Sequence, residues 1–143
     1  MNDGLHGIST LGLAHVGDAV FELMVRTWLS VHGASTAKKL HGGSVALSSA
    51  KSQAAAAERV LPRLSEEELA VYRRGRNAHG GSAPRSSSHG EYHASTGLEA
   101  LFGHLYLSGS IDRLNELFLI VVDANSEIGT CLLRTTDESH TLL

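Results

Sequence analysis

The sequence has few of the residues that mark secreted, membrane-spanning or metal-caged proteins. Its 143 residues include one cysteine, Cys131, which cannot form an internal disulfide or a cysteine-based metal site. The longest purely apolar run covers residues 117–122, far short of the roughly 20 residues that a membrane helix needs. The first residues show no basic segment followed by an apolar core, so no secretory signal is expected. We therefore expect a soluble cytoplasmic domain without a membrane partner.

Prolines and aromatic residues are also scarce. Two prolines favour long, uninterrupted secondary structure, and three Phe, three Tyr and one Trp are too few for a platform that stacks single-stranded nucleic acid. The hydrophobic content of 42% and charged content of 19% are ordinary for a globular protein. The length fits one domain, or one domain with a short tail.

Apolar residues recur at helical spacing along most of the chain, which predicts an all-α fold. The first predicted helix, 11–31, is apolar nearly all round, so we expect it at the centre of the bundle or in a subunit interface. Its one polar stripe consists of His15, Asp18, Glu22 and Arg26. The pattern predicts further helices over 36–41, 45–60, 66–74, 93–107 and 110–122.

Local signals set the expected ends of these helices. Gly42 and Gly43 are expected to end the second helix and Pro62 the third, while Ser65 and Glu68 form the sequence pattern of a capping box. Residues 75–92 are rich in Gly and Ser and predict a long loop. Residues 123–143 lack periodicity and are expected to form a frayed or disordered tail.

The charges are distributed unevenly. Although the chain carries a net charge of −3, residues 38–85 hold nine Lys or Arg against four Glu. A basic block in an otherwise acidic chain suggests a polyanion site, and solvated helix faces are the alternative. Within this block, four arginines fall on a helix end and the Gly-rich stretch that follows, where they could bind phosphates or only stabilise the helix C-terminus.

Two carboxylates stand inside apolar helical segments. Asp18 lies in VGDAVF (16–21) and Glu99 in GLEALF (97–102), and acids are rarely buried unless they are paired. Two carboxylates on rigid helices can jointly bind a divalent metal, which can activate water for attack on a phosphodiester. The alternative is structural: Asp18 pairs with His15 or near Arg26, and Glu99 pairs with an arginine elsewhere.

Several of these segments together resemble the ribonuclease III family. LAHVGDAVFEL (13–23) is similar to the signature helix of its catalytic domains, and GRNA (75–78) followed by TGLEALFGHLYL (96–107) is similar to its second catalytic helix. Segments such as SAKSQA (49–54) and RRGRNA (73–78) resemble the short bacterial branch, Mini-ribonuclease III. The resemblance covers about residues 5–120.

The resemblance implies an all-α endonuclease domain that forms a homodimer. It implies hydrolysis of double-stranded RNA with Mg²⁺, which Mn²⁺ can replace, leaving 5′-phosphates, in maturation of the large-subunit (23S) ribosomal RNA precursor. Asp18 and Glu99 match the family's catalytic, metal-binding carboxylates, and the segment 73–85 matches its RNA-contacting loop. The expected RNA-binding residues are Arg73, Arg74, Arg76, Asn77 and Arg85, with Lys38, Lys39 and Lys51 as weaker candidates. Glu22 is expected to support the metal ligands from behind, or only to pair with Arg26.

The sequence departs from the long enzymes of the family at two positions. They carry two further acids where this chain has Ala14 and Thr96, so only two of four carboxylates remain. This leaves open an alternative function, an inactive domain that binds double-stranded RNA without cutting it. We expect residues 1–122 to form the catalytic domain and 123–143 its tail, with no separate RNA-binding domain.

Overall fold

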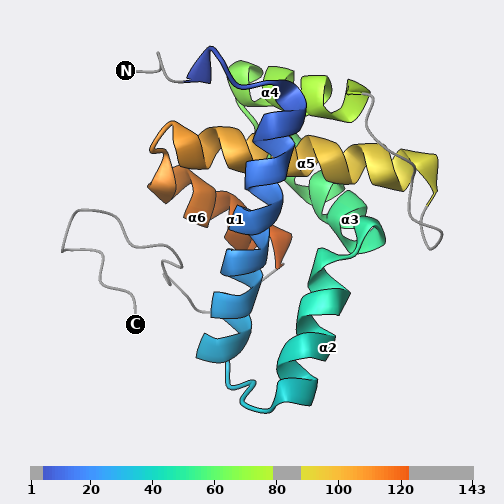
Figure 1. Cartoon of the computed structure of the whole chain (residues 1–143), viewed down its shortest axis with the longest axis vertical. Helices are drawn as coiled ribbons and strands as arrows, with labels where there is room; N and C mark the ends of the chain where they lie inside the picture. The colour runs from blue at the N-terminus through green and yellow to red at the C-terminus, as the bar shows by residue number, and fades with distance from the viewer. Residues whose placement is uncertain (1–4, 79–87, 123–143) are drawn as a thin grey trace.

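The computed structural model describes residues 5–78 and 88–122, which form six α-helices, one short 3-10 helix and no strand (Figure 1). The α-helices are α1 (Thr10–Val31), α2 (Ala37–Ser48), α3 (Ala50–Val60), α4 (Glu66–Asn77), α5 (His89–Leu107) and α6 (Ile111–Val121). The 3-10 helix η2 (Leu61–Arg63) contains the proline that ends α3. The predicted all-α class is confirmed within these residues.

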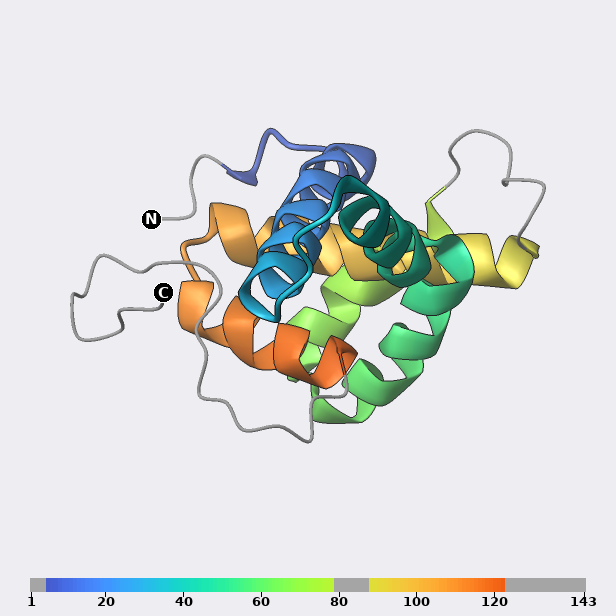
Figure 2. The same cartoon turned by 90° about the horizontal axis from the view of Figure 1, so that it is seen from below.

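Helix α5 forms the centre of the bundle. It packs against α1, α3, α4 and α6, and Figure 2 shows α1 and α2 on one side of it and α3, α4 and α6 on the other. The last turn of α1 and most of α2 extend beyond this body as a helical hairpin (Figure 1). None of the described helices is long and apolar enough to cross a membrane.

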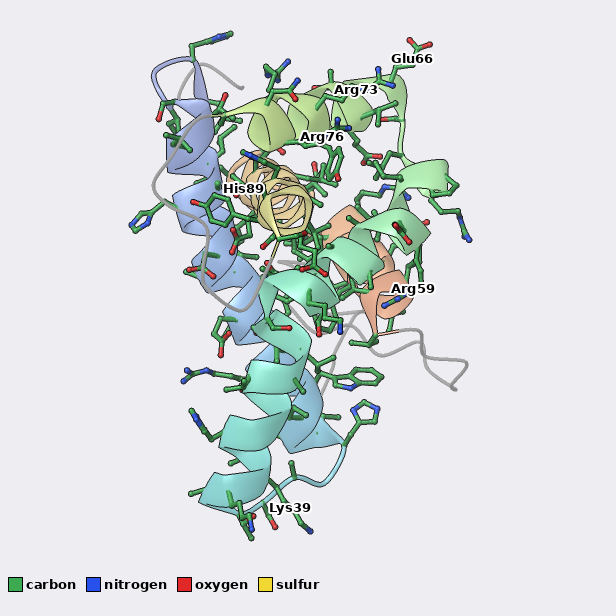
Figure 3. The ribbon with its side chains drawn as sticks, turned by 90° about the vertical axis from the view of Figure 1, so that its right-hand side faces the viewer. Lys39, Arg59, Glu66, Arg73, Arg76 and His89 are labelled. Carbon is green, nitrogen blue, oxygen red and sulfur yellow. The ribbon has the colours of Figure 1, made fainter. Side chains whose placement is uncertain are left out.

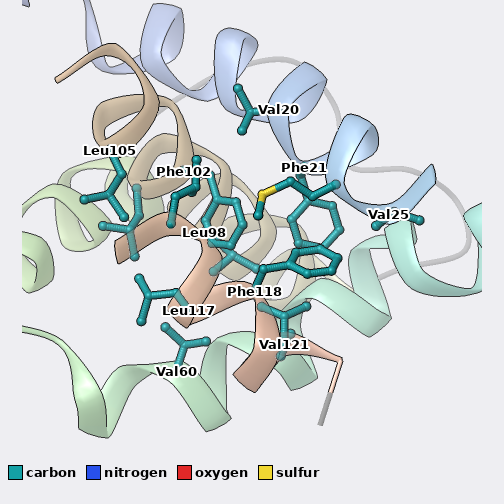
Figure 4. Packing of buried hydrophobic residues seen from close by; sticks show 14 residues of the cluster. Val20, Phe21, Val25, Val60, Leu98, Phe102, Leu105, Leu117, Phe118 and Val121 are labelled. Carbon is teal, nitrogen blue, oxygen red and sulfur yellow. The ribbon is translucent and has the colours of Figure 1, made fainter. Parts of the chain in front are cut away.

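The core is a cluster of side chains from α1, α3, α5 and α6 (Figure 4). Three fully buried phenylalanines lie at its centre, with the ring of Phe21 5.4 Å from that of Phe102 and 5.9 Å from that of Phe118. Tilted and edge-on ring pairs of this kind add to the stabilisation from apolar burial. The first helix, expected at the centre of the bundle or in a subunit interface, contributes Phe21, Met24 and Val25 to this core, where all three are completely buried.

The predicted boundaries of the second and third helices, 36–41 and 45–60, were wrong. Helix α2 continues through Gly42 and Gly43, and a break at Ser49, whose side chain caps α3, divides the predicted helix 45–60. Each glycine costs a helix only about 1 kcal/mol, and a Cβ at Gly43 would lie 2.7 Å from the Leu29 side chain. We infer that Gly43 permits the close packing of α2 on α1, which outweighs this cost.

The connection between α4 and α5 is shorter at both ends than the predicted loop 75–92. Helix α4 extends to Asn77, and α5 begins at His89 because Ser88 and Glu91 form a capping box. At the C-terminal end of α4, the helix continues through Gly75, where a Cβ would lie 2.6 Å from that of Ala100. Residues 79–87 and the predicted tail 123–143 lie outside the described residues, as does Cys131.

Glu68 links two helices besides capping one. The predicted capping box is confirmed, with Glu68 Oε1 accepting from the Ser65 backbone N–H at 2.8 Å. Both carboxylate oxygens also accept from Arg113 of α6 at 2.9 Å. The Arg113 hydrogen bond is the main reason why the pKa of Glu68 is lowered from its ordinary 4.5, against the opposing effect of burial.

This ion pair predicts a pH-dependent stability. Because the pKa of Glu68 is lower in the folded protein, its contribution is fully present above about pH 4.5 and is lost as the pH falls through the lowered value. Glu68→Gln should lower the free energy of unfolding by about 2 kcal/mol at neutral pH. Urea titrations of both proteins from neutral pH into acid measure the difference, and a difference that does not shrink in acid would contradict the assignment.

Candidate active site

Two glycines bring α1 and α5 into backbone contact. A Cβ at Gly17 would lie 1.6 Å from the carbonyl oxygen of Glu99, and one at Gly103 would lie 2.0 Å from that of Leu13. No side chain fits between the two helices at this crossing. Asp18 follows Gly17 on α1 and Glu99 lies on α5 at the same crossing, so the backbone itself brings these two carboxylates together.

The pairing of the carboxylates changes the ionisation of one of them. The pKa of Glu99 is raised from 4.5 to about 8, first by partial burial and then by the hydrogen bonding and negative charge of Asp18. The Gln53 amide opposes these effects. Among the described residues, neither carboxylate forms a salt bridge. The structural alternative, in which each carboxylate pairs with a nearby cation, is therefore not found among the described residues.

Asp18 differs from the expectation that both acids are buried. It is exposed, whereas Glu99 is half-buried. The reason is that Asp18 lies on the polar stripe of α1, which faces away from the core. The site is thus open to solvent on the Asp18 side, which suits a large substrate.

The pair fits a divalent cation in charge and ligand type. Mg²⁺ prefers oxygen ligands and retains several waters, so two carboxylates can hold it, and a cation would relieve the repulsion that raises the pKa of Glu99. Within residues 5–78 and 88–122, no group of three or more His, Cys, Asp or Glu side chains could hold a metal. Any metal here would therefore rest on Asp18 and Glu99.

Glu22 lies one helical turn beyond Asp18 on α1 and is already engaged. One oxygen accepts from Arg26 Nε at 2.9 Å and the other from Ser48 Oγ of α2 at 2.7 Å. The predicted pairing with Arg26 is thus confirmed. The contact with Ser48 also ties α2 to α1 near the carboxylate pair, which sequence reasoning did not anticipate. A supporting role toward the metal ligands stays a prediction.

Three arginines of the basic block lie together on α4, at one end of the molecule. Arg73, Arg74, Arg76 and Asn77 are all exposed on the C-terminal half of α4. Figure 3 shows Arg73 and Arg76 on the same end of the bundle as His89, where α5 begins. A cavity of about 390 Å³ lies there, lined by Arg76, Asn77, Gly90 and His93.

The lysines are not gathered with these arginines. Lys38 and Lys39 are exposed in the first turn of α2, and Figure 3 shows Lys39 at the far end of the projecting hairpin from Arg73 and Arg76. Lys51 is exposed in the first turn of α3. Arg85 lies outside the described residues. One protomer therefore presents the α4 arginines as a group, and the role of Lys38, Lys39 and Lys51 toward RNA stays a prediction.

Sequence reasoning missed two polar residues beside Glu99. Gln53 of α3 and Ser95 of α5 are 1% and 6% exposed, and Ser95 Oγ donates to Gln53 Oε1. Gln53 stands in the Ala-rich segment SQAAAA (52–57), where it resembles an ordinary polar residue of a helix. The sequence signal that could have identified a polar neighbour of Glu99 was Ser95, because it lies one turn before Glu99 on the same face of the helix.

Comparison with known proteins agrees with this geometry. The Ribonuclease III domain model matches residues 11–110, which include both carboxylates and both crossing glycines. Mini-ribonuclease 3 of Symbiobacterium thermophilum is 44% identical over 79% of this chain and 87% of its own length. Mini-ribonuclease 3 of a Thermoanaerobacter species is 37% identical over 87% and 88% of the two chains.

A solved structure has the same architecture. A crystal structure of a protein from Fusobacterium nucleatum superposes with a TM-score of 0.75 at 28% identity, covering 83% of this chain and 95% of that one. The family match, the identities and the shared fold agree with the sequence motifs. The chain belongs to the ribonuclease III family, within its Mini-ribonuclease 3 branch.

Proposed function

We propose that this ribonuclease is a Mg²⁺-dependent endonuclease that cleaves double-stranded RNA and leaves 5′-phosphates. The observation that carries the proposal is the pair of carboxylates, Asp18 and Glu99, at the α1–α5 crossing without a neutralising cation among the described residues. A domain that only binds RNA has no use for two acids held together in this way. The natural substrate that the family resemblance implies is the precursor of large-subunit (23S) ribosomal RNA.

Each part of the site has a defined task in this reaction. Asp18 and Glu99 would hold the metal, which when bound supplies an activated water and stabilises the leaving oxygen. The exposed side of Asp18 admits the RNA backbone. The arginines of α4 fix the phosphates by forked hydrogen bonds, which suits duplex RNA because proteins recognise it by its shape and backbone.

A homodimer would place two such sites on one duplex, one for each strand. The chain exposes large apolar side chains on α1 and α2, among them Leu23 at 51% and Val45 at 56%. Exposed apolar residues on a helix that is otherwise central are a feature of subunit interfaces. Pairing through these helices would also double the number of arginines that face the RNA.

The decisive experiment compares cleavage and binding on the same labelled RNA. Purified protein is incubated with a duplex, its single strand and a DNA duplex of equal sequence, each with Mg²⁺ or with a chelator. We expect discrete short products with 5′-phosphate ends from the RNA duplex with Mg²⁺ alone. If the duplex is shifted on a gel yet stays intact with Mg²⁺ and with Mn²⁺, the chain is instead the non-cleaving binding module.

Salt dependence tests the RNA-contacting arginines. The logarithm of the binding constant falls linearly with the logarithm of the salt concentration, and each phosphate contact adds about one unit to the magnitude of this slope. Arg73→Ala, Arg74→Ala and Arg76→Ala should therefore each weaken duplex binding and lower the slope by about one. Arg63→Ala is the matched control, since this exposed arginine lies on η2, outside the group. Equal slopes in all five proteins would exclude the α4 surface as the RNA contact.

A further inference from the structure

Gln53 is the most deeply buried polar residue near the carboxylate pair. It lies on α3, which carries neither carboxylate, and its side chain is 1% exposed. A glutamine amide brings two donors and an acceptor into the interior, and each needs a partner if burial is not to cost stability. Its position therefore requires a physical explanation.

Ser95 fixes which way the Gln53 amide points. Ser95 Oγ donates to Gln53 Oε1, so the carbonyl side of the amide faces Ser95 and the Nε2 side faces away from it. Ser95 and Glu99 are four residues apart on α5 and so lie on one face of the helix. This hydrogen bond consequently holds Gln53 within one helical turn of Glu99.

The Nε2 donor of Gln53 has no hydrogen-bond partner within the described part of the chain, although the atom is fully buried. The Gln53 side chain lies close enough to Glu99 to act on its carboxyl group. A buried donor left without a partner costs about 1–3 kcal/mol. That cost is removed if a carboxylate oxygen of Glu99 turns to accept from Nε2.

We propose that Gln53 is a positioning residue for Glu99: Ser95 orients the Gln53 amide, and Nε2 donates to one carboxylate oxygen so that the other is held for a divalent metal. The proposal rests on the proposed function, since it assumes that Asp18 and Glu99 hold that metal. It assigns α3 a part in the site. Polar groups behind a metal ligand orient it, and their loss lowers metal affinity by about 10–100-fold.

Mn²⁺ binding in the absence of RNA tests the proposal without relying on cleavage. Gln53→Met keeps the length of the side chain and removes the donor. We expect its Mn²⁺ dissociation constant, followed by electron paramagnetic resonance of the free ion, to rise about tenfold. The Mg²⁺ concentration for half-maximal cleavage should rise in parallel, while the rate at saturating Mg²⁺ recovers to near that of the wild type.

Ser95→Ala and the double variant give a thermodynamic cycle. Ser95 acts through Gln53, so Ser95→Ala should weaken Mn²⁺ binding in the wild-type background and have no further effect beside Gln53→Met. Asn115→Leu is the control for loss of a buried polar group, because Asn115 is 5% exposed on α6, which carries neither carboxylate. It should lower the melting temperature and leave the Mn²⁺ dissociation constant unchanged.

The outcomes separate this proposal from the proposed function. Wild-type Mn²⁺ affinity in Gln53→Met, or a loss no larger than in Asn115→Leu, overturns the positioning role while RNA cleavage by the wild type stands. If Gln53→Met does not fold, an unchanged affinity in Ser95→Ala overturns it equally. A wild-type protein that neither binds Mn²⁺ nor cuts duplex RNA overturns both.

Discussion

Asp18→Asn and Glu99→Gln should each lower the rate of RNA cleavage by about three orders of magnitude, which corresponds to about 4 kcal/mol in the activation barrier. Each substitution keeps the size of the side chain and removes the negative charge that would hold the metal. With only two carboxylates in the site, neither has a substitute within the described residues. Single-turnover cleavage of a labelled duplex at saturating Mg²⁺ measures the loss.

Duplex binding by the same variants provides the control. The arginines of α4 do not contact the carboxylate pair, so gel-shift affinities in the presence of a chelator should remain near the wild-type value. Asp112→Asn is the matched acidic variant outside the site, because Asp112 is exposed in the first turn of α6. It should retain most of the cleavage rate. Cleavage by Asp18→Asn within tenfold of the wild type would show that the metal is held elsewhere.

Gly17→Ala is expected to be among the most destabilising single substitutions in the molecule. The added Cβ would meet the Glu99 carbonyl oxygen at 1.6 Å and the Gly103 backbone nitrogen at 2.8 Å. Backbone atoms cannot move aside as a flexible side chain can, so α1 and α5 must separate along their whole contact. We expect a loss of about 4 kcal/mol or more in the free energy of unfolding, a large share of the stability of an ordinary domain.

Gly42→Ala is the matched control for this prediction. Gly42 lies inside α2, and a Cβ there would meet nothing within 4 Å. Because alanine is the better helix former, the substitution should stabilise the protein by about 0.5–1 kcal/mol. Urea denaturation followed by circular dichroism compares the two variants. A Gly17→Ala protein as stable as the wild type would mean that the two helices do not touch at this crossing.

The fold could be predicted from the sequence mainly because its helices have clear apolar faces. The errors arose where a local signal competed with packing. Gly42 and Gly43 resemble a helix end, yet α2 continues through them because it packs on α1. The start of α5 was placed four residues late because the capping pattern of Ser88 and Glu91 was overlooked.

The candidate site was predictable only in part. Asp18 and Glu99 stand out as acids in apolar segments, and the family resemblance predicted that they act in the same site. Their difference in exposure depends on which sides of α1 are covered, which periodicity alone does not determine. Gln53 is 42 residues from its partner Ser95 in the chain, and no local pattern connects two positions so far apart.

The backbone contact at Gly17 and Gly103 has a consequence for how the protein opens. Amide hydrogens at the α1–α5 crossing can exchange with solvent only when the central helices separate, which amounts to global unfolding. Helix α2, in which Ser44 is the buried residue, extends beyond the core and can open by itself at lower cost (Figure 1). We therefore expect the two carboxylates to lie in the slowest-exchanging unit of the described structure and to keep their spacing when the surrounding helices open.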